Sequence, residues 1–265
     1  MGVLSDLLTR AAGTPVKPVT YDDCVMYWKN LNCKTTEDYF TALDNFVTVF
    51  TMNNGHIEGD ILSYLSTRSI MQDEEIYAYT GNVSGIISAK NHVHAFNSFI
   101  NHVLSDVPLS EDLIKYFHKQ LMCGCYDNIR TAKGEIPGSY KIGDYCTGVA
   151  DVGAYPEEVP IAMGELLDEV LEATPTTHED VLKVAAYLHA VFESIHPFAD
   201  GNGRVGRFIM NYYLVSHGHP PVVIYQEDKE TYYMALEVYN RTEQLNGFVQ
   251  FLKEQTIKTW KNRVR

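Results

Sequence analysis

Twelve consecutive residues, 196–207, bring together glycines and polar side chains in a pattern suited to binding phosphate groups. Gly201 and Gly203 flank Asn202 just before an expected helix. Glycine lets the backbone adopt unusual dihedral angles and approach a ligand closely. The first turn of a helix offers unpaired N–H groups and the positive end of the helix dipole. These features predict an anion-binding nest at the start of that helix.

Side chains that could carry chemistry surround the predicted nest. Arg204 and Arg207 are three residues apart, so both can lie on one helix face, and two guanidinium groups suit a polyphosphate. Asp200 stands beside the nest, where a lone carboxylate next to phosphates commonly holds Mg²⁺. His196 could take a proton from an attacking hydroxyl, and Phe198 is expected to anchor the loop in the core. We therefore predict a nucleotidyl transferase that uses ATP and Mg²⁺.

Other readings of these residues are weaker. A lone histidine or a glycine turn between helices is more often structural, so the combination within one short run carries the prediction. The chain has no Gly-x-x-x-x-Gly-Lys-Ser/Thr motif, which excludes a P-loop protein. The run from Asp200 begins like a calcium loop, but Arg204 takes its fifth position and the final Glu is missing. Glu193 and His196 have the Glu-x-x-His spacing of di-iron bundles, yet no second pair accompanies them.

The overall charge narrows the class of partner. The 265 residues carry a formal net charge of −13, so nucleic-acid phosphates and anionic membranes would be repelled. The one basic cluster, residues 258–265, is interpreted as a solvated helix end. We expect no nucleic-acid or membrane partner, and a small basic ATP site within an acidic body.

Cysteine usage and the chain start point to the cytoplasm. The five cysteines fit neither a disulfide framework nor a zinc site, and we expect reduced thiols. The first residues lack the pattern of a signal peptide or a myristoylation site. No apolar stretch approaches the length of a membrane span.

Helical periodicity dominates the chain and positions the run 196–207 between two helices. Apolar residues recur at helical spacing over 177–195, where Thr177 and Asp180 form a capping-box pattern, and Pro197 ends this helix. A second helix is expected over 203–216, with Gly218 near its C-terminal cap. Further helices are expected within 21–52, 60–72, 88–104, 110–123, 161–173, 229–241 and 246–261.

Residues 134–156 interrupt the helical pattern. The segment contains five glycines and two prolines, separated by short stretches rich in Tyr, Ile and Val. This composition predicts a β-hairpin or an irregular flap, which could serve as a lid or docking edge. A plain surface loop is the alternative.

The run His-Pro-Phe-x-Asp-Gly-Asn-Gly-Arg-x-x-Arg resembles the signature of the Fic family, with every fixed position met. The resemblance covers roughly residues 50–250 and is weaker outside 190–242. It implies an all-α, Fic-type helical bundle with a small β-hairpin flap. Most members of that family transfer AMP from ATP to a Ser, Thr or Tyr hydroxyl of a target protein.

The resemblance implies a role for each matching residue. His196 would be the base, Asp200 the Mg²⁺ ligand, and Arg207 the group that holds the γ-phosphate. The flap around residues 149–154 would align the target segment by strand addition. The α- and β-phosphates would bind Gly201, Asn202, Gly203 and Arg204, and the adenine and ribose would contact Tyr232, Tyr233 and Asn240.

An upstream segment is similar to the inhibitory motif of many Fic proteins, Ser/Thr-x-x-x-Glu-Gly/Asn. Glu58 and Gly59 fit this motif, but Asn54 stands in place of Ser or Thr. If Glu58 pairs with Arg207, that arginine cannot hold the γ-phosphate. Asn54 could loosen this contact, although asparagine can still hydrogen-bond. The inhibitory segment is expected at 53–66, within a Fic domain of residues 51–265 that forms one unit with a helical segment at 1–50.

We therefore expect a self-inhibited protein adenylyltransferase that modifies an unidentified target protein and itself. The alternatives are transfer of UMP, GMP, phosphate or phosphocholine on the same scaffold, or removal of AMP. A nucleotide-sensing module without turnover is the alternative from another class. The oligomeric state stays open.

Overall fold

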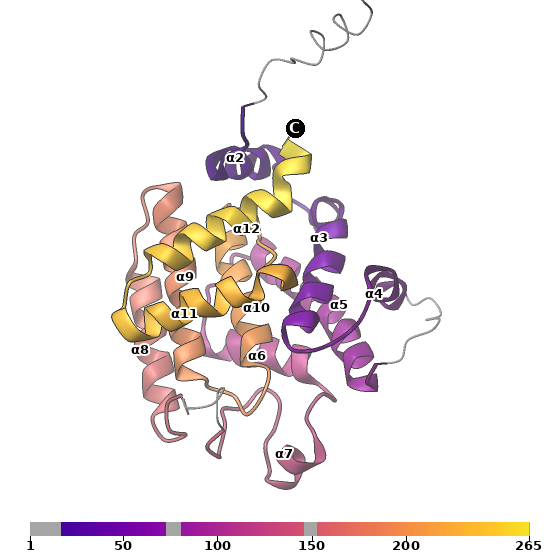
Figure 1. Cartoon of the computed structure of the whole chain (residues 1–265), viewed down its shortest axis with the longest axis vertical. Coiled ribbons are helices and arrows are strands. Elements are labelled where there is room, and N and C mark those ends of the chain that lie inside the picture. Colours follow the sequence, from indigo (N-terminus) through magenta and orange to yellow (C-terminus); the bar gives the residue numbers. More distant parts are fainter. Residues whose placement is uncertain (1–16, 73–80, 146–152, 265) are drawn as a thin grey trace, which may run out of the picture.

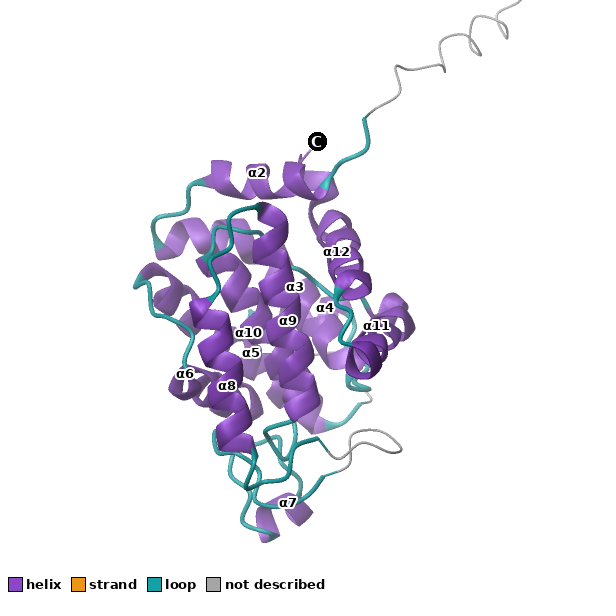
Figure 2. Ribbon diagram, turned by 90° about the vertical axis from the view of Figure 1, so that its left-hand side faces the viewer, coloured by secondary structure: helices purple, strands orange, loops and turns teal. Residues whose placement is uncertain are grey.

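The computed structural model describes residues 17–72, 81–145 and 153–264. All regular structure in these ranges is helical, in agreement with the expected all-α class (Figures 1 and 2). The helices are α2 (Tyr21–Leu31), α3 (Thr36–Ile57), α4 (Tyr64–Met71), α5 (Val83–Leu104), α6 (Glu111–Met122), α7 (Asn128–Ala132), α8 (Val159–Glu172), α9 (His178–Ile195), α10 (Asn202–Ser216), the 3₁₀ turn η1 (Gln226–Asp228), α11 (Lys229–Thr242) and α12 (Asn246–Val264).

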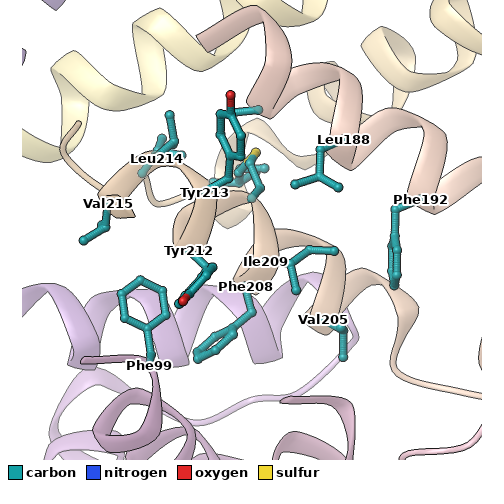
Figure 3. Packing of buried hydrophobic residues seen from close by; sticks show 14 of the residues in the cluster. Phe99, Leu188, Phe192, Val205, Phe208, Ile209, Tyr212, Tyr213, Leu214 and Val215 are labelled. Atoms are coloured by element: carbon teal, nitrogen blue, oxygen red, sulfur yellow. The ribbon is translucent and has the colours of Figure 1, made fainter. Parts of the chain in front are cut away.

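Helix α10 lies at the centre of the bundle. It contacts α9 on one side and α3, α5 and α6 on the other, while α11 and α12 pack against α9 (Figure 1). Phe208 and Tyr212 each place their ring 5.4 Å from the ring of Phe99 on α5. Leu188 and Phe192 of α9 lie on the opposite side of α10 (Figure 3). A helix that is buried on nearly every side gives its first turn a rigid support.

One apolar core connects the N-terminal helices to the rest of the bundle. Buried residues of α2, α3 and every long helix from α5 to α12 belong to the same cluster. Helix α3 runs continuously through residues 50 and 51, where the N-terminal segment was expected to meet the Fic domain. Trp260 of α12 packs edge-on against Trp28 of α2, so the first and last described helices pack together.

Local capping explains where the helices that carry the site begin and end. The side chain of Thr177 accepts from the backbone N–H of Asp180, and the carboxylate of Asp180 accepts from the backbone N–H of Thr177. The capping box expected at this position is therefore confirmed. Gly218 follows α10 with φ +70°, and its N–H donates to the carbonyl of Val215.

The expected hairpin between 134 and 156 falls partly outside the described residues, which exclude 146–152 and most of the flap at 149–154. Residues 134–145 and 153–156 contain no strand. A compact loop occupies 134–145 instead, because Glu135 accepts hydrogen bonds from the backbone N–H of Ile142 and Gly143 and from the hydroxyl of Tyr145.

No helix among the described ranges is both long and apolar enough to cross a bilayer.

Candidate active site

His196 occupies the sharp bend at the end of α9. Its backbone is in the left-handed region at φ 52°, and its N–H donates to the carbonyl of Phe192 at 3.0 Å. Burial and then the nearby charge of Lys141 lower the pKa of His196 to about 4. A hydrogen bond to the backbone carbonyl of Glu193 acts in the opposite direction on this pKa and orients the ring. The imidazole is therefore neutral near pH 7 and can accept a proton.

Two loop segments close over this bend. The N–H of Lys141 donates to the carbonyl of Pro197 at 2.9 Å, and the N–H of Ala154 donates to the carbonyl of Ile195 at 3.0 Å. A Cβ at Gly153, which has φ +65°, would lie 2.7 Å from the Cβ of His196. Only glycine fits this approach, so the start of the 153–156 segment is shaped to pass beside the histidine.

Phe198 anchors the loop as expected, and it does so against a histidine that sequence reasoning missed. Phe198 is fully buried, and its ring stacks on that of His118 with centroids 3.7 Å apart. Nδ1 of His118 accepts from the backbone N–H of Gly138 at 2.7 Å, so Nε2 carries the proton and donates to the carbonyl of Asp200 at 3.0 Å. No pattern in the sequence pointed to His118, because its partners lie up to 82 residues away.

Asn202 and Gly201 shape the backbone of the predicted nest. The amide of Asn202 closes the loop on Phe198, accepting from its N–H at 2.9 Å and donating to its carbonyl at 2.7 Å. Gly201 has φ +80°, and the side chain of Met122 occupies the space that a Cβ would need. The loop geometry thus requires both residue types at the start of α10, where the first N–H groups of a helix have no partner within the helix.

A carboxylate already lies against this nest. A Cβ built on Gly203 would fall 2.5 Å from Oε1 of Glu58 and 3.0 Å from Nη1 of Arg207. The same Glu58 oxygen accepts from Nη2 of Arg207 at 2.6 Å. Burial alone would raise the pKa of Glu58, but Arg207 and Arg204 outweigh it and hold that pKa below its usual value. Glu58 is therefore ionised at neutral pH and fills an anion position.

Arg207 is held from several sides. Only 2% of it is exposed. Its Nε donates to Oδ1 of Asn54 at 2.5 Å, and its Nη1 lies 3.5 Å from the hydroxyl of Tyr232. One oxygen of Glu193 is buried nearby, and burial raises the pKa of that carboxyl to about 7. The predicted pairing of Glu58 with Arg207 is present, and Asn54 takes part in the same cluster.

Asp200 and Arg204 face a cavity of about 400 Å³. Oδ1 of Asp200 accepts from the N–H of Gly201 at 2.7 Å and lies 3.3 Å from Nη2 of Arg204. The rest of the lining comes from the end of α3 and the segment after it, from the residues just before α5 and its first turns, and from Cys125 after α6. The cavity is thus continuous with the nest and has room for groups larger than a single phosphate.

No group of three or more His, Cys, Asp or Glu side chains among the described residues is arranged to hold a metal ion. Asp200, whose side chain is about one third exposed, stands at the cavity edge next to the nest. A cation there would take its remaining ligands from phosphates and water, which is how Mg²⁺ is commonly bound. The donor set therefore fits Mg²⁺ carried by a nucleotide.

The three residues predicted to contact the adenine and ribose lie on α11, but in different environments. Tyr232 is fully buried, and its hydroxyl lies 2.7 Å from Nε2 of His189. Tyr233 is 45% exposed. Asn240 is exposed, and its Oδ1 accepts from the hydroxyl of Ser194 on α9. The structure joins Tyr232 to Arg207, while the nucleotide contacts of all three stay predictions.

Comparisons with known proteins agree with this arrangement. Residues 108–214 match the Fic/DOC family model. The chain is 28% identical over 208 residues to the protein adenylyltransferase Fic of Culex quinquefasciatus, which covers 77% of this chain and 39% of that protein. The corresponding protein of Drosophila persimilis is 43% identical over 75 residues. The chain thus spans about two fifths of the length of the first of these curated relatives, and the match to the second covers 15% of that protein.

Two solved structures share the fold. A Fic domain containing signaling protein from Bacteroides thetaiotaomicron superposes with a TM-score of 0.77 at 27% identity, covering 92% of this chain and 95% of that one. Fic-1 from C. elegans gives a TM-score of 0.73 at 21% identity, covering 98% of this chain and 73% of the other. The helical arrangement is therefore a shared one, with the sequence motif at its centre.

Proposed function

We propose that this chain, whose residues 108–214 match the Fic/DOC family model, is a protein adenylyltransferase. It transfers AMP from Mg-ATP to a Ser, Thr or Tyr hydroxyl of a target protein, with itself as one target, and Glu58 restrains the reaction. The relatives named above support a transferase at the level of the family. The particular donor, the self-modification and the restraint are our proposals for this chain.

One observation carries the proposal: the anion nest at the start of α10 lies beside both a neutral histidine and two arginines. Glu58 rests against Gly203 with its carboxylate 2.6 Å from Arg207, so the site already accommodates an oxyanion. A phosphate group offers the same kind of acceptor oxygens with more charge. The cavity beside Asp200 supplies the space for the rest of a triphosphate.

The chain's own residues suit the steps of AMP transfer. His196, neutral at pH 7, takes the proton of the attacking hydroxyl as the oxygen forms a bond to the α-phosphorus. The bond from that phosphorus to the pyrophosphate oxygen breaks, and pyrophosphate leaves with its negative charge. Arg204 and the N–H groups of the first turn of α10 hold the charge that develops on the phosphate oxygens.

Asp200 is the residue that would hold Mg²⁺ together with the bound nucleotide. A bound Mg²⁺ would neutralise part of the phosphate charge. The backbone carbonyl of Asp200 accepts a hydrogen bond from His118, and Oδ1 of Asp200 accepts from the N–H of Gly201. The carboxylate is thus kept beside the nest before any nucleotide binds.

The restraint follows from competition for Arg207. Nη2 of Arg207 already donates to the carboxylate of Glu58, so the guanidinium cannot hold a phosphate at the same place. Nucleotide binding must therefore displace Glu58 or proceed without that arginine. The sequence left open whether Asn54 loosens this contact or hydrogen-bonds in place of Ser or Thr, and in the structure Asn54 accepts a hydrogen bond from the same guanidinium.

The decisive experiment compares the position of the label in ATP. Incubation of the Glu58→Gly variant with ATP labelled on the α-phosphate should label the protein, and the Glu58→Gly/His196→Ala variant should not be labelled. Label that arrives only from the γ-phosphate would indicate a kinase and contradict the proposal. A panel of α-labelled UTP, GTP and CTP tests transfer of other nucleotides. Tight ATP binding without any label transfer would favour a nucleotide-sensing module.

A further inference from the structure

We propose that Asn54 positions Arg207 to bind the nucleotide, and that its own orientation is set by His92. Asn54 therefore supports the reaction, although it lies in the segment that restrains it. This inference rests on the proposed function, because one of its tests measures AMP transfer. A second test measures ATP affinity and does not require transfer.

The first argument is which edge of the guanidinium each partner occupies. Nε of Arg207 donates to Oδ1 of Asn54 at 2.5 Å, and Nη2 lies 3.4 Å from the backbone carbonyl of Asn54. Nε and Nη2 form one edge of the guanidinium. The other edge, Nη1 and Nη2, faces Gly203 and carries Glu58. A phosphate that replaced Glu58 would leave the contact with Asn54 intact.

The second argument is that the amide of Asn54 has only one consistent orientation. The carbonyl of Ser88 can only accept, so Nδ1 of His92, 2.7 Å away, carries the proton. Nε2 of His92 is then an acceptor, and the Nδ2 amide of Asn54 donates to it at 2.9 Å. The amide oxygen is thereby directed at Arg207, which can only donate.

Burial keeps this arrangement in place. Asn54 and His92 are 2% and 1% exposed, and burial lowers the pKa of His92 to about 4, so the ring stays neutral and able to accept. The end of α3 is also fixed independently of Glu58. Asn53 accepts from the N–H of Gln226 at 2.9 Å, and Lys229 donates to the carbonyl of Ile57.

These contacts separate two roles within one turn of helix. Glu58, at the C-terminal cap of α3, can turn away by side-chain rotation, because its side chain is about one third exposed. Asn54 lies one turn earlier and has no such freedom. Without Asn54, the fully buried guanidinium of Arg207 would have no acceptor for its Nε–H, and its orientation would no longer be fixed.

The test places each substitution in the Glu58→Gly background and measures binding of Mg-ATP and Mg-ADP by calorimetry. Asn54→Ala should weaken ATP binding about tenfold, the effect of one hydrogen bond to a charged group. ADP should be affected less, since it lacks the phosphate assigned to Arg207, so the preference for ATP over ADP should fall. AMP transfer should fall in parallel.

His92 provides an independent pair of variants. His92→Phe removes the acceptor that orients Asn54 and should reproduce part of the loss of ATP affinity. His92→Gln can still accept from Asn54 and should retain an affinity within about threefold of the background. This pair decides the inference if Asn54→Ala lowers the melting temperature so far that the variant does not fold.

Asn53→Ala is the matched control, because Asn53 is equally buried in the same turn but contacts Gln226 and Val49 instead of Arg207. It should lower thermal stability without changing the preference for ATP.

Unchanged or tighter ATP binding by Asn54→Ala would overturn the inference and leave the proposed function intact. ATP binding without label transfer by Glu58→Gly would contradict the proposed function, while the ATP affinities still decide the inference. No ATP binding by Glu58→Gly would overturn both.

Discussion

Two segments meet at Arg207: the α9–α10 junction, residues 196–207, and the α3 end, residues 53–60. Several contacts of the junction are local, since Asn202 bonds to Phe198 and Arg204 lies beside Asp200, each four residues away. The side-chain contacts of the α3 end with Arg207 cross 149 to 153 residues of sequence. The chemical groups are thus assembled within a short run, whereas their restraint depends on how distant helices pack.

This difference has a physical consequence. A local hydrogen-bonded loop forms at little additional entropic cost once its flanking helices are in place, whereas each long-range contact requires the whole bundle. Substitutions in the junction should therefore affect the reaction directly. At the α3 end, substitution of Glu58 should shift the balance between restrained and open states, whereas substitution of Asn54 should weaken nucleotide binding. The predictions below test this distinction from the largest expected effect to the smallest.

The largest effect is expected at the junction. His196→Ala in the Glu58→Gly background should lower AMP transfer by roughly a hundred- to ten-thousand-fold, the usual contribution of a general base. The unfolding midpoint should change far less than the rate of transfer, because the side chain is partly exposed and removing it disturbs the core only locally. The measurement is incorporation of α-label over time. Substantial residual transfer with normal dependence on pH would show that another group accepts the proton.

At the α3 end, the single substitution Glu58→Gly should raise self-modification roughly tenfold to a hundredfold over the unsubstituted protein. The carboxylate accepts a hydrogen bond from Nη2 of Arg207. A charged hydrogen bond of this kind stabilises the restrained state by about 1.5–3 kcal/mol before solvent screening. The initial rate of labelling measures the effect. Asp60→Asn is the control, since it removes a charge from the same cavity. An equal rise in both variants would point to general electrostatics and not to the contact with Arg207.

His118 tests whether the junction also depends on a distant support. His118→Ala removes a ring stacked on Phe198 and two hydrogen bonds, so the free energy of unfolding should fall by about 2–4 kcal/mol in urea titrations. His102→Ala is the control, because it also removes a histidine ring packed against α6, at Tyr116 and Phe117, but its one hydrogen bond stays within its own helix, to the carbonyl of Ser98. A loss no greater than that of the control would show that the contacts of His118 do not support the junction.

The smallest effect concerns Glu193 of α9, whose carboxylate lies against α10 beside Gly206. Burial raises the folded-state pKa of Glu193 from 4.5 to about 7. The contribution of its protonated form to the free energy of unfolding is therefore fully present below pH 4.5 and is lost as the pH rises through 7. Glu193→Gln should remove this loss, and the variant should gain about 1–3 kcal/mol relative to the unsubstituted protein between pH 4.5 and 8. Urea titrations at several pH values measure it. A difference that does not vary with pH would contradict the raised pKa.

Much of the architecture was predictable from periodicity and capping signals. The helix expected over 177–195 is present as α9 with its capping box at Thr177, and the helix expected over 203–216 is α10. Phe198 was correctly expected to be an anchor. The short helix α7 was missed, because its five residues are too few to show a period. The hairpin expected in 134–156 is not seen among the described residues, where Glu135 organises the backbone N–H groups of a loop instead.

The sequence by itself determined the helical class and the chemical run 196–207, because both depend on residue types at short spacing. It also pointed to Glu58 as a partner of Arg207, through its resemblance to a known motif. Only the tertiary structure decided which edge of Arg207 faces Glu58 and which faces Asn54, and that His92 and His118 support the site. Side-chain contacts between distant helices leave no periodic trace in a sequence, since they depend on how the helices pack and on which way each polar group must point once water is excluded.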